Sequence, residues 1–334
     1  MKLVISKTPL RVSLFGGGTD LKSFYKLYGG AVLSFTINKF LYVIVKKNAK
    51  VVDFKYRINW SKTEFANKID DIEHPIVRET FRLFKIDFPI EVSTFSDIPA
   101  NTGLGSSSAF AVGLINSLSR LLNLNYSSKK IAELASKIEV DILKRNIGKQ
   151  DHYASAYGGM NKIEFNKTGK VKVSKFNLDN NKKKKLNDSF LIFFLNKKRD
   201  ASKILNNQKN LKKKNVESLK QMKKIVFKAE NIIKIKKNLI PNFGKLLSEN
   251  WYWKKRNNYN VSYDVVDKIY EKGIKAGAYG GKLLGAGGGG YFLFISDNKA
   301  KNKIKNKIKK FSTINIDIYN KGTHIIYDTK EKNY

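Results

Sequence analysis

Two acidic residues in the middle of the chain, Glu139 and Asp151, have the chemistry that a phosphoryl transfer requires. Such a reaction needs Mg²⁺ on a nucleoside triphosphate and a group that orients and deprotonates the acceptor hydroxyl. Because Mg²⁺ takes only one or two protein oxygens, a serine hydroxyl and one carboxylate are sufficient to hold it. The second carboxylate is then left for the acceptor. Taken alone, both acids also fit ordinary solvated side chains.

A stretch rich in glycine and serine, PANTGLGSSSA at Pro99–Ala109, has the composition of a phosphate-binding loop. Gly103 and Gly105 allow the backbone to approach a ligand closely and to adopt dihedral angles that a Cβ would forbid. Ser106–Ser108 open a helix predicted over Phe110–Leu122, and the first turn of a helix has unpaired N–H donors that attract phosphate. The alternative is a turn that only caps the helix. A Walker A loop is excluded, because GxxxxGK[ST] occurs nowhere in the chain.

A second glycine-rich segment, LFGGGTD at Leu14–Asp20, places a carboxylate directly after a tight turn. Three successive glycines allow the chain to turn sharply at the surface. The carboxylate of Asp20 could then accept hydrogen bonds from sugar hydroxyls. The alternative is a plain loop in which Thr19 or Asp20 caps a helix predicted over Leu21–Tyr28.

A third glycine-rich segment, GGKLLGAGGGG at Gly280–Gly290, contains the spacing GxGxxG. In a dinucleotide-binding site these glycines join a strand to a following helix. Here the strand-like run Tyr291–Ile295 comes next instead. The context therefore excludes a dinucleotide site and predicts a glycine loop that leads into a strand.

Apolar patterns predict the elements that must position these residues. A strand over Ile90–Phe95 leads into the phosphate loop, and a helix with a core-facing apolar stripe follows the loop. One of the serines at 127–128 begins the next helix, and Glu139 lies late on that helix. Asp151 comes after it in a polar loop. We therefore expect the phosphate loop and the two acids to share one domain.

The remaining apolar segments predict further strands and a second domain. Strands are expected over Ala31–Thr36 and Phe40–Lys46, with a turn at Asn38–Lys39 between them. The polar segment Asn177–Asp188 is rich in lysine, lacks periodicity and predicts a linker. The order strand, helices, strand, helix, strand after it is typical of a ferredoxin-like domain, with the last strand over Thr323–Tyr327.

The composition bounds the class of protein and its partners. A net charge of +37 in 334 residues suggests nucleic acid or an anionic membrane, but the excess is lysine spread along the chain, with only eight arginines. Arginine is the usual reader of bases, and no aromatic stacking signature accompanies the lysines. We therefore predict no nucleic-acid and no membrane partner. A basic protein that binds either without catalysis is the remote alternative.

The absence of cysteine excludes disulfides, thiolate catalysis and cysteine-based zinc sites. No apolar run approaches the roughly 20 residues that a membrane span requires. The N-terminal residues lack the apolar core of a signal peptide. The expected location is the cytoplasm.

The segments TPLRVSLFGGGTD, PANTGLGSSSA and GAGGGG resemble, in this order, the three motifs of the GHMP kinases. This superfamily includes galactokinase, homoserine kinase, mevalonate kinase and phosphomevalonate kinase. The resemblance implies an α+β fold with ATP between two domains. These are an N-terminal domain of the ribosomal S5 domain 2-like type over residues 1–180, and a ferredoxin-like C-terminal domain over residues 181–334.

The resemblance also implies roles for individual residues. Asp151 corresponds to the catalytic aspartate, and Arg11 lies near the transferring phosphoryl group. Ser107, with Ser106 as the alternative, and Glu139 are the implied Mg²⁺ ligands. The implied ATP-binding residues are Pro99, Asn101, Thr102, Gly103, Leu104, Gly105, Ser106, Ser107 and Ser108. The implied sugar-binding segment is Gly17, Gly18, Thr19 and Asp20, and the structural glycine loop contains Gly285, Gly287, Gly288 and Gly289.

Within the superfamily, the motifs and the segment IGKQDHYASAYGG look most like the kinases of D-glycero-α-D-manno-heptose 7-phosphate, which phosphorylate the anomeric hydroxyl to give the 1,7-bisphosphate. His152 stands where relatives commonly carry glutamine, so a kinase for another sugar, such as fucose or an N-acetylhexosamine, is the alternative. Cations lie near the site loops at Arg11, Lys149, Arg199 and Lys282. We therefore predict a sugar phosphate as acceptor, with Arg199 as a substrate ligand, although Arg199 also fits a surface residue at a helix start.

Overall fold

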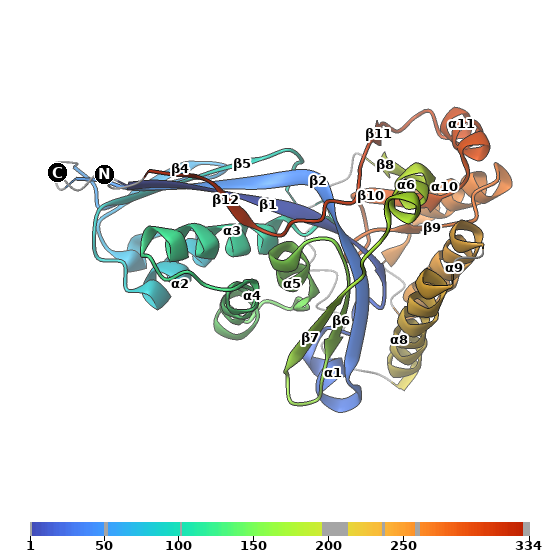
Figure 1. Ribbon diagram of the computed structural model, residues 1–334, viewed down its shortest axis with the longest axis horizontal. Coiled ribbons are helices and arrows are strands. Elements are labelled where there is room, and N and C mark those ends of the chain that lie inside the picture. The colour runs from blue at the N-terminus through green and yellow to red at the C-terminus, as the bar shows by residue number, and fades with distance from the viewer. Residues whose placement is uncertain are drawn as a thin grey trace.

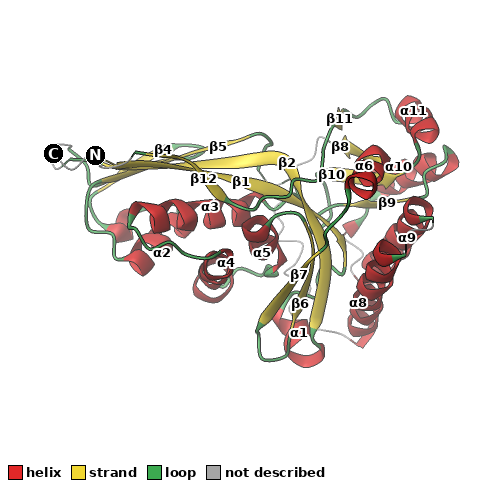
Figure 2. Ribbon diagram, in the orientation of Figure 1, coloured by secondary structure: helices red, strands yellow, loops and turns green. Residues whose placement is uncertain are grey.

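The computed structural model describes residues 2–49, 53–100, 102–195, 213–235, 238–257 and 261–329. These residues form two sheets with helices packed against them (Figures 1 and 2). The larger sheet has eight strands and the smaller has four. Arg199 and Asn101, two of the predicted site residues, lie outside the described residues.

Two long strands, β1 (Lys2–Phe15) and β2 (Gly30–Lys47), form the centre of the large sheet. They pair antiparallel from Lys2 opposite Lys47 to Phe15 opposite Leu33. The predicted turn at Asn38–Lys39 is wrong, because β2 continues through these residues. Asn38 instead binds a later segment: its backbone N–H donates to the Asp317 carbonyl oxygen at 3.0 Å, and its side-chain oxygen accepts from the Asp317 N–H at 2.8 Å.

The other strands of the large sheet flank this pair in the order β12-β1-β2-β5-β3-β4, and β6 pairs with both β2 and β7. Their bounds are β3 (Tyr56–Asn59), β4 (Thr63–Ala66), β5 (Ile90–Ser96), β6 (Met160–Phe165), β7 (Val171–Lys175) and β12 (His324–Asp328). The expectation that the last strand completes the C-terminal sheet is wrong. β12 pairs antiparallel with β1, with Val4 opposite Asp328.

Helices cover one face of the large sheet (Figure 1). They are α2 (Pro75–Phe84), α3 (Ser106–Leu121), α4 (Ser128–Ser136) and α5 (Gln150–Tyr157). The apolar stripe predicted for α3 is buried: Leu114 and Leu118 have no exposed surface and join one core with Val43 of β2. Burial of a leucine side chain contributes about 1.5–3 kcal/mol, so this stripe fixes α3 against the sheet. A short helix, α1 (Lys22–Tyr28), follows the first glycine loop.

The smaller sheet has the order β11-β8-β10-β9 and contains strands from the C-terminal half. Their bounds are β8 (Phe190–Phe194), β9 (Gly280–Leu283), β10 (Tyr291–Ile295) and β11 (Thr313–Ile314), and the helices around them are α6 (Asn180–Ser189), α8 (Lys213–Lys234), α9 (Leu239–Asn257), α10 (Asp264–Lys275) and α11 (Asn298–Lys307). The aromatic and aliphatic side chains of β10 are all buried, which accounts for its unbroken apolar sequence.

The segment Asn177–Asp188, which lacks periodicity and was predicted to be a linker, is helical for most of its length, because Asn180–Ser189 form α6. The Asp179 side chain caps this helix by accepting a hydrogen bond from the Lys182 N–H at 2.7 Å. Leu186 is fully buried and anchors the helix in the core. A single buried leucine in a lysine-rich stretch does not create a periodic apolar pattern, so the sequence did not predict this helix. A domain boundary near residue 180 stays a prediction.

Candidate active site

The phosphate loop leads directly into α3, as its glycines and serines predict. Gly103 and Gly105 have φ angles of +87° and +77°, in the region where a side chain is strained. Gly105 is the N-cap of α3 and offers no side chain to its first turn, so the N–H groups there are left for an anion. The loop is tied to β1, because the Arg11 N–H donates to the Leu104 carbonyl oxygen at 3.1 Å.

Arg11 and Asp151 form a bidentate ion pair beside this loop. The Arg11 Nε and Nη2 atoms donate to the two Asp151 oxygens at 2.6 and 2.5 Å. The remaining Nη1 donates to the Gly103 carbonyl oxygen at 2.8 Å, so one guanidinium joins the carboxylate to the phosphate loop. The expectation that Asp151 lies in a loop is wrong, because Asp151 lies in the first turn of α5. Its side chain is 20% exposed and therefore accessible from solvent.

Glu139 lies on a short π-helix, η2 (Lys137–Ile142), that continues α4. Its Oε1 atom accepts a hydrogen bond from the Ser107 hydroxyl at 2.7 Å, so the helix and the phosphate loop meet at this carboxylate. Its Oε2 atom lies 2.9 Å from His152 Nε2, and both of these side chains are fully buried. Since a carboxylate only accepts, this His152 nitrogen carries the proton. π-helical turns occur frequently at functional sites.

The surroundings of Glu139 hold it in the ionised form. Burial alone would raise the pKa of this carboxyl group. The hydrogen bond from His152 and the positive charge of Arg145 outweigh burial and lower that pKa to about 2. Arg145 also donates to Glu139 Oε1 at 2.7 Å and to the Ser107 hydroxyl oxygen at 2.9 Å. The structure therefore brings Ser107 and Glu139 together around one cation.

This donor set fits Mg²⁺. One carboxylate oxygen and one hydroxyl oxygen converge at the start of the phosphate loop, and Mg²⁺ prefers such a small protein contribution completed by phosphate and water oxygens. No group of three or more acidic or histidine side chains gathers as a metal site among the residues the structure describes. Ser107 supplies the contact to Glu139, whereas Ser108 is buried. The three consecutive serines alone do not indicate which of them contacts Glu139.

Asp20 lies beneath the start of α5, close to Asp151. Its two oxygens accept hydrogen bonds from the Gly18 N–H at 2.9 Å and from the Gln150 N–H at 3.2 Å. Burial, and then the negative charge of Asp151, raise its pKa. A Cβ at Gly148 would overlap the Asp20 carboxylate, so a glycine is required there. The first glycine segment and the start of α5 thus bring two carboxylates, those of Asp20 and Asp151, close together.

The other predicted members of the first glycine segment have different surroundings. Thr19 is fully buried, and its hydroxyl oxygen lies 2.7 and 2.8 Å from the main-chain oxygens of Gly16 and Ala31, so its one proton is donated within the turn. These bonds hold the turn rather than present the hydroxyl to a ligand. Gly17 and Gly18 are partly exposed on the same turn. Of the predicted sugar-binding residues in this segment, Asp20 is the one whose position beside Asp151 is fixed by two backbone donors.

The third glycine loop packs against the phosphate loop. Gly103 lies against Leu284 and Gly285, and Gly290 lies so close to the Thr102 backbone that a Cβ would overlap it. Gly287, Gly288 and Gly289 are buried in the same turn. The Thr102 hydroxyl in turn donates to the Pro99 carbonyl oxygen at 2.9 Å. The two halves of the chain therefore meet at backbone contacts that leave little room for side chains.

Two lysines of the C-terminal half complete this junction. Lys282, on β9, donates to the Ser13 and Leu14 carbonyl oxygens of β1 at 3.1 and 2.8 Å. Lys254, on α9, donates to the Leu283 and Gly285 carbonyl oxygens at 3.1 and 2.6 Å. Burial and the charge of Arg11 lower the pKa of Lys254 to about 7. Lys282, predicted only to lie near the site loops, thus joins the two halves through its bonds to β1.

Arg145 and Lys254 are the two residues of this site that the sequence patterns did not single out. Arg145 lies within the segment that precedes Asp151, but no motif marks it. Lys254 lies on a helix rich in basic and aromatic residues, where one lysine is indistinguishable from its neighbours. Each reaches the site through contacts that the local sequence does not reveal: Arg145 with Ser107 and, around a turn, with Glu139, and Lys254 with Gly285.

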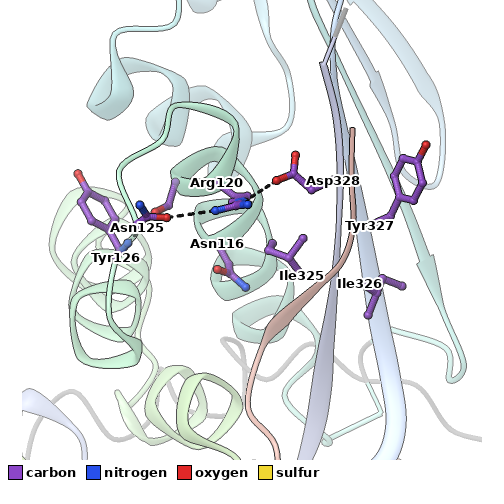
Figure 3. Close-up of a pocket in the computed structure, with 9 residues that line it drawn as sticks. Asn116, Arg120, Asn125, Tyr126, Ile325, Ile326, Tyr327 and Asp328 are labelled. Atoms are coloured by element: carbon purple, nitrogen blue, oxygen red, sulfur yellow. Dashed lines mark hydrogen bonds and ion pairs between the residues drawn. The ribbon is translucent and has the colours of Figure 1, made fainter. Parts of the chain in front are cut away.

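A separate pocket of about 550 Å³ lies between the end of α3 and β12, away from the phosphate loop (Figure 3). Arg120 faces this pocket and donates to Asp328 at 2.5 Å and to Asn125 at 3.4 Å. Its charged groups therefore bind one another, and none of the residues predicted for the site line it. We assign this pocket no chemistry.

Comparisons with known proteins agree with these findings. The model for the GHMP kinases N terminal domain matches residues 74–159, and the model for the GHMP kinases C terminal matches residues 231–313. The chain is 34% identical, over 93% of its length and 94% of the relative's, to a D-glycero-α-D-manno-heptose 7-phosphate kinase of Campylobacter jejuni. It is 26% identical to a galactokinase of Pyrococcus furiosus, over 90% and 91% of the two chains.

Solved structures show the same fold. A D-glycero-D-manno-heptose 1-phosphate kinase from Bacteroides thetaiotaomicron superposes with a TM-score of 0.78 at 23% identity, covering 97% of this chain and 99% of that one. A putative sugar kinase from Campylobacter jejuni superposes with a TM-score of 0.71 at 28% identity, covering 98% and 99%. Among the described residues, no helix is long and apolar enough to cross a membrane.

Proposed function

This chain belongs to the GHMP kinase family, with its two-domain fold, and from that premise we propose that it phosphorylates D-glycero-α-D-manno-heptose 7-phosphate on the anomeric hydroxyl. The γ-phosphoryl group of ATP is transferred, and the products are the 1,7-bisphosphate and ADP. The observation that carries the choice of sugar is the 34% identity to the Campylobacter jejuni enzyme of that name, which extends over nearly the full length of both chains.

The proposed nucleotide site is the start of α3. The N–H groups that Gly105 leaves unpaired, together with the positive end of the helix dipole, suit the phosphates of ATP. Ser107 and Glu139 would hold Mg²⁺, and their oxygens already converge at 2.7 Å. When bound, Mg²⁺ neutralises charge that develops on the transferring phosphoryl group. Glu139 is suited to this role because its low pKa keeps it ionised at any physiological pH.

Asp151 would orient the anomeric hydroxyl and accept its proton. Its side chain is partly exposed, and Arg11 fixes the plane of the carboxylate through two hydrogen bonds. Little proton transfer is needed before the phosphoryl group moves in a loose transition state, so a carboxylate paired with arginine is adequate. Arg11 also lies against the phosphate loop, where its charge stabilises the phosphoryl group in transit.

Asp20 would bind hydroxyl groups of the sugar. Its position near Asp151 places an acceptor of hydrogen bonds beside the proposed base, and the Gly18 and Gln150 N–H groups hold it there. Sugar hydroxyls donate to carboxylates in charge-assisted bonds, which are about twice as strong as neutral ones. This arrangement would favour the orientation of the bound sugar in which the anomeric hydroxyl faces Asp151.

The phosphate at the far end of the sugar would supply binding energy that positions the reacting end. Lys149 comes just before Asp151 at the start of α5 and is a candidate ligand for that phosphate, as is Arg199. Because remote binding energy is used to orient the reacting atoms, a substrate without the phosphate loses kcat as well as affinity. The test is the ratio of kcat/KM for the heptose 7-phosphate to that for the free heptose. Equal values would contradict the proposal.

A kinase for a free sugar is the second candidate, because the chain is also similar to galactokinases over about nine-tenths of its length. Galactose, fucose and N-acetylhexosamines are the sugars to test. The same assay separates the two candidates: release of ADP with a free sugar at the rate found for the sugar phosphate favours the second. Measurement across a panel of both classes, with ATP and Mg²⁺ held constant, covers every alternative in one experiment.

A further inference from the structure

Arg145 lies where the proposed metal ion would bind. One of its nitrogen atoms, Nη1, is 2.7 Å from Glu139 Oε1 and 2.9 Å from Ser107 Oγ. These are the same two oxygen atoms that would coordinate Mg²⁺. The Arg145 side chain is 31% exposed, so its guanidinium can leave toward solvent without disrupting the core.

The backbone fixes Arg145 in this position. Two residues after η2, Lys144 adopts a φ angle of +50°. The Arg145 N–H then donates to the Glu139 carbonyl oxygen at 3.0 Å, and the Arg145 carbonyl oxygen accepts from the Ile147 N–H at 2.9 Å. Backbone hydrogen bonds at both the N–H and the carbonyl oxygen of Arg145 therefore hold the turn from which its guanidinium reaches Glu139.

The charges explain why this position attracts a cation. Glu139 is fully buried, and His152 occupies its Oε2 atom. The Oε1 atom is thus the one left to face a counter-ion. Mg²⁺ binds oxygen at about 2.0–2.1 Å in a strict octahedral shell, so it cannot share Oε1 and the Ser107 hydroxyl with a guanidinium nitrogen in hydrogen-bonding contact. Two cations within about 4 Å also repel each other strongly in a poorly solvated site.

We propose that Arg145 is a resident cation that fills the magnesium position in the nucleotide-free enzyme and is displaced when the metal binds with nucleotide. The inference rests on the proposed assignment of Ser107 and Glu139 as metal ligands. It adds that the free protein has low affinity for the metal ion alone, because the metal must first remove Arg145. Phosphate oxygens of the nucleotide supply the further ligands that make the exchange favourable. Until the metal ion binds, Arg145 pairs with the buried Glu139 carboxylate and holds Glu139 and Ser107 in place.

Direct binding of Mn²⁺ tests the proposal without any sugar. Mn²⁺ replaces Mg²⁺ at oxygen sites, and the electron paramagnetic resonance signal of free Mn²⁺ reports the bound fraction. In the absence of nucleotide, Arg145→Gln should bind Mn²⁺ at least about tenfold more tightly than the unchanged protein, the factor that corresponds to about 1.4 kcal/mol. Lys144→Gln is the matched control, because it removes an adjacent exposed charge that does not contact the two oxygens. Equal affinity in the unchanged and Arg145→Gln proteins, or an equal gain in the control, overturns the proposal.

Two further measurements keep the test decisive. Should Arg145→Gln not fold, Arg145→Met keeps most of the apolar stem but has neither charge nor donor, so Mn²⁺ affinity should again rise. An unchanged affinity in Arg145→Met contradicts the proposal. Titration in the presence of ADP then separates the two levels of inference. If ADP promotes Mn²⁺ binding but Arg145 has no effect without it, the metal site stands and the role of Arg145 falls. If Mn²⁺ binds under no condition, the metal site itself is wrong and the inference falls with it.

Discussion

Asp151 and Glu139 each pair with an arginine, but the two pairs differ in which member is exposed. Asp151 is 20% exposed, and its partner Arg11 makes three hydrogen bonds, two to Asp151 and one to the Gly103 carbonyl oxygen. Glu139 has no exposed surface, and the arginine that it binds is the exposed member of its pair. The two sites are therefore opposites: at Asp151 the carboxylate is open and the cation fixed, and at Glu139 the carboxylate is fixed and the cation is free to leave.

This difference separates the two chemical roles. A group that exchanges a proton with an acceptor must be reachable, whereas a ligand for a metal ion must stay ionised and still. His152 helps to enforce the second condition by occupying the oxygen of Glu139 that faces away from the phosphate loop. Exposure and fixation together, rather than the identity of the acid, support the proposed roles of base and metal ligand.

The largest effect is expected from Asp151→Asn. The amide keeps the shape of the side chain but removes the group that accepts the proton and the charge that pairs with Arg11. Loss of a positioned base lowers kcat by about 10²–10⁴. ATP affinity should stay close to its original value, as measured by titration of the nucleotide. A near-native kcat in this variant would show that the open carboxylate is not the base.

The next effect concerns the pH dependence of stability at Glu139. Its pKa is about 2 in the folded protein, against 4.5 when unperturbed, so its charge stabilises the fold above pH 4.5 and this contribution is lost as the pH falls toward 2. The full contribution is about 3 kcal/mol, of which about 2 kcal/mol is gone by pH 3. Urea unfolding between pH 6 and pH 3 should show this loss in the unchanged protein and not in Glu139→Gln. Parallel curves would contradict the fixed, ionised state of this carboxylate.

A smaller effect is expected on the requirement for Mg²⁺. Glu139→Gln should raise the Mg²⁺ concentration for half-maximal rate by roughly tenfold, equivalent to about 1.4 kcal/mol, and Ser107→Ala by less, because a hydroxyl contributes a weaker ligand than a carboxylate. Ser106→Ala is the control. A shift in that control as large as in Ser107→Ala would move the metal site along the loop.

The smallest effect is expected from His152→Gln. Glutamine can donate one hydrogen bond to Glu139 Oε2, as His152 Nε2 does at 2.9 Å. The Mg²⁺ requirement should change by less than about threefold, whereas His152→Leu leaves that buried oxygen without its donor and should cost about 1–3 kcal/mol in unfolding free energy. Equal stability of the two variants would show that Glu139 does not depend on this donor.

The sequence allowed much of this site to be predicted, because its motifs are local. Glycines and serines that act within one turn, such as Gly103 and Ser107, are recognisable from their spacing alone. The placement of Asp151 in a loop was wrong because α5 is short and only weakly amphipathic. Arg145 and Lys254 could not be predicted, because each depends on a contact with a segment far along the chain or around a turn.

The predictions of the fold likewise succeeded for local features and failed where long-range contacts decide the structure. Helices with strong apolar stripes, such as α3, were predicted nearly to their ends. The single strand β2 was divided wrongly because its polar residue Asn38 serves a contact to Asp317 that only the folded chain creates. The local sequence of a strand does not indicate whether it pairs within the smaller sheet or with the large sheet. The pairing of β12 with β1 was therefore not predicted.

That returning strand bears on how the protein is made. β12 covers the edge of β1, so β1 gains this neighbour only after residues 324–328 have been synthesised. Until then β1 carries a row of unpaired backbone groups, the feature by which growing chains join one another into aggregates. Residues 16–323 are synthesised after β1 and before β12, so this edge of β1 stays uncovered during that interval. The pairing of β12 with β1 therefore determines when the edge is protected from other chains.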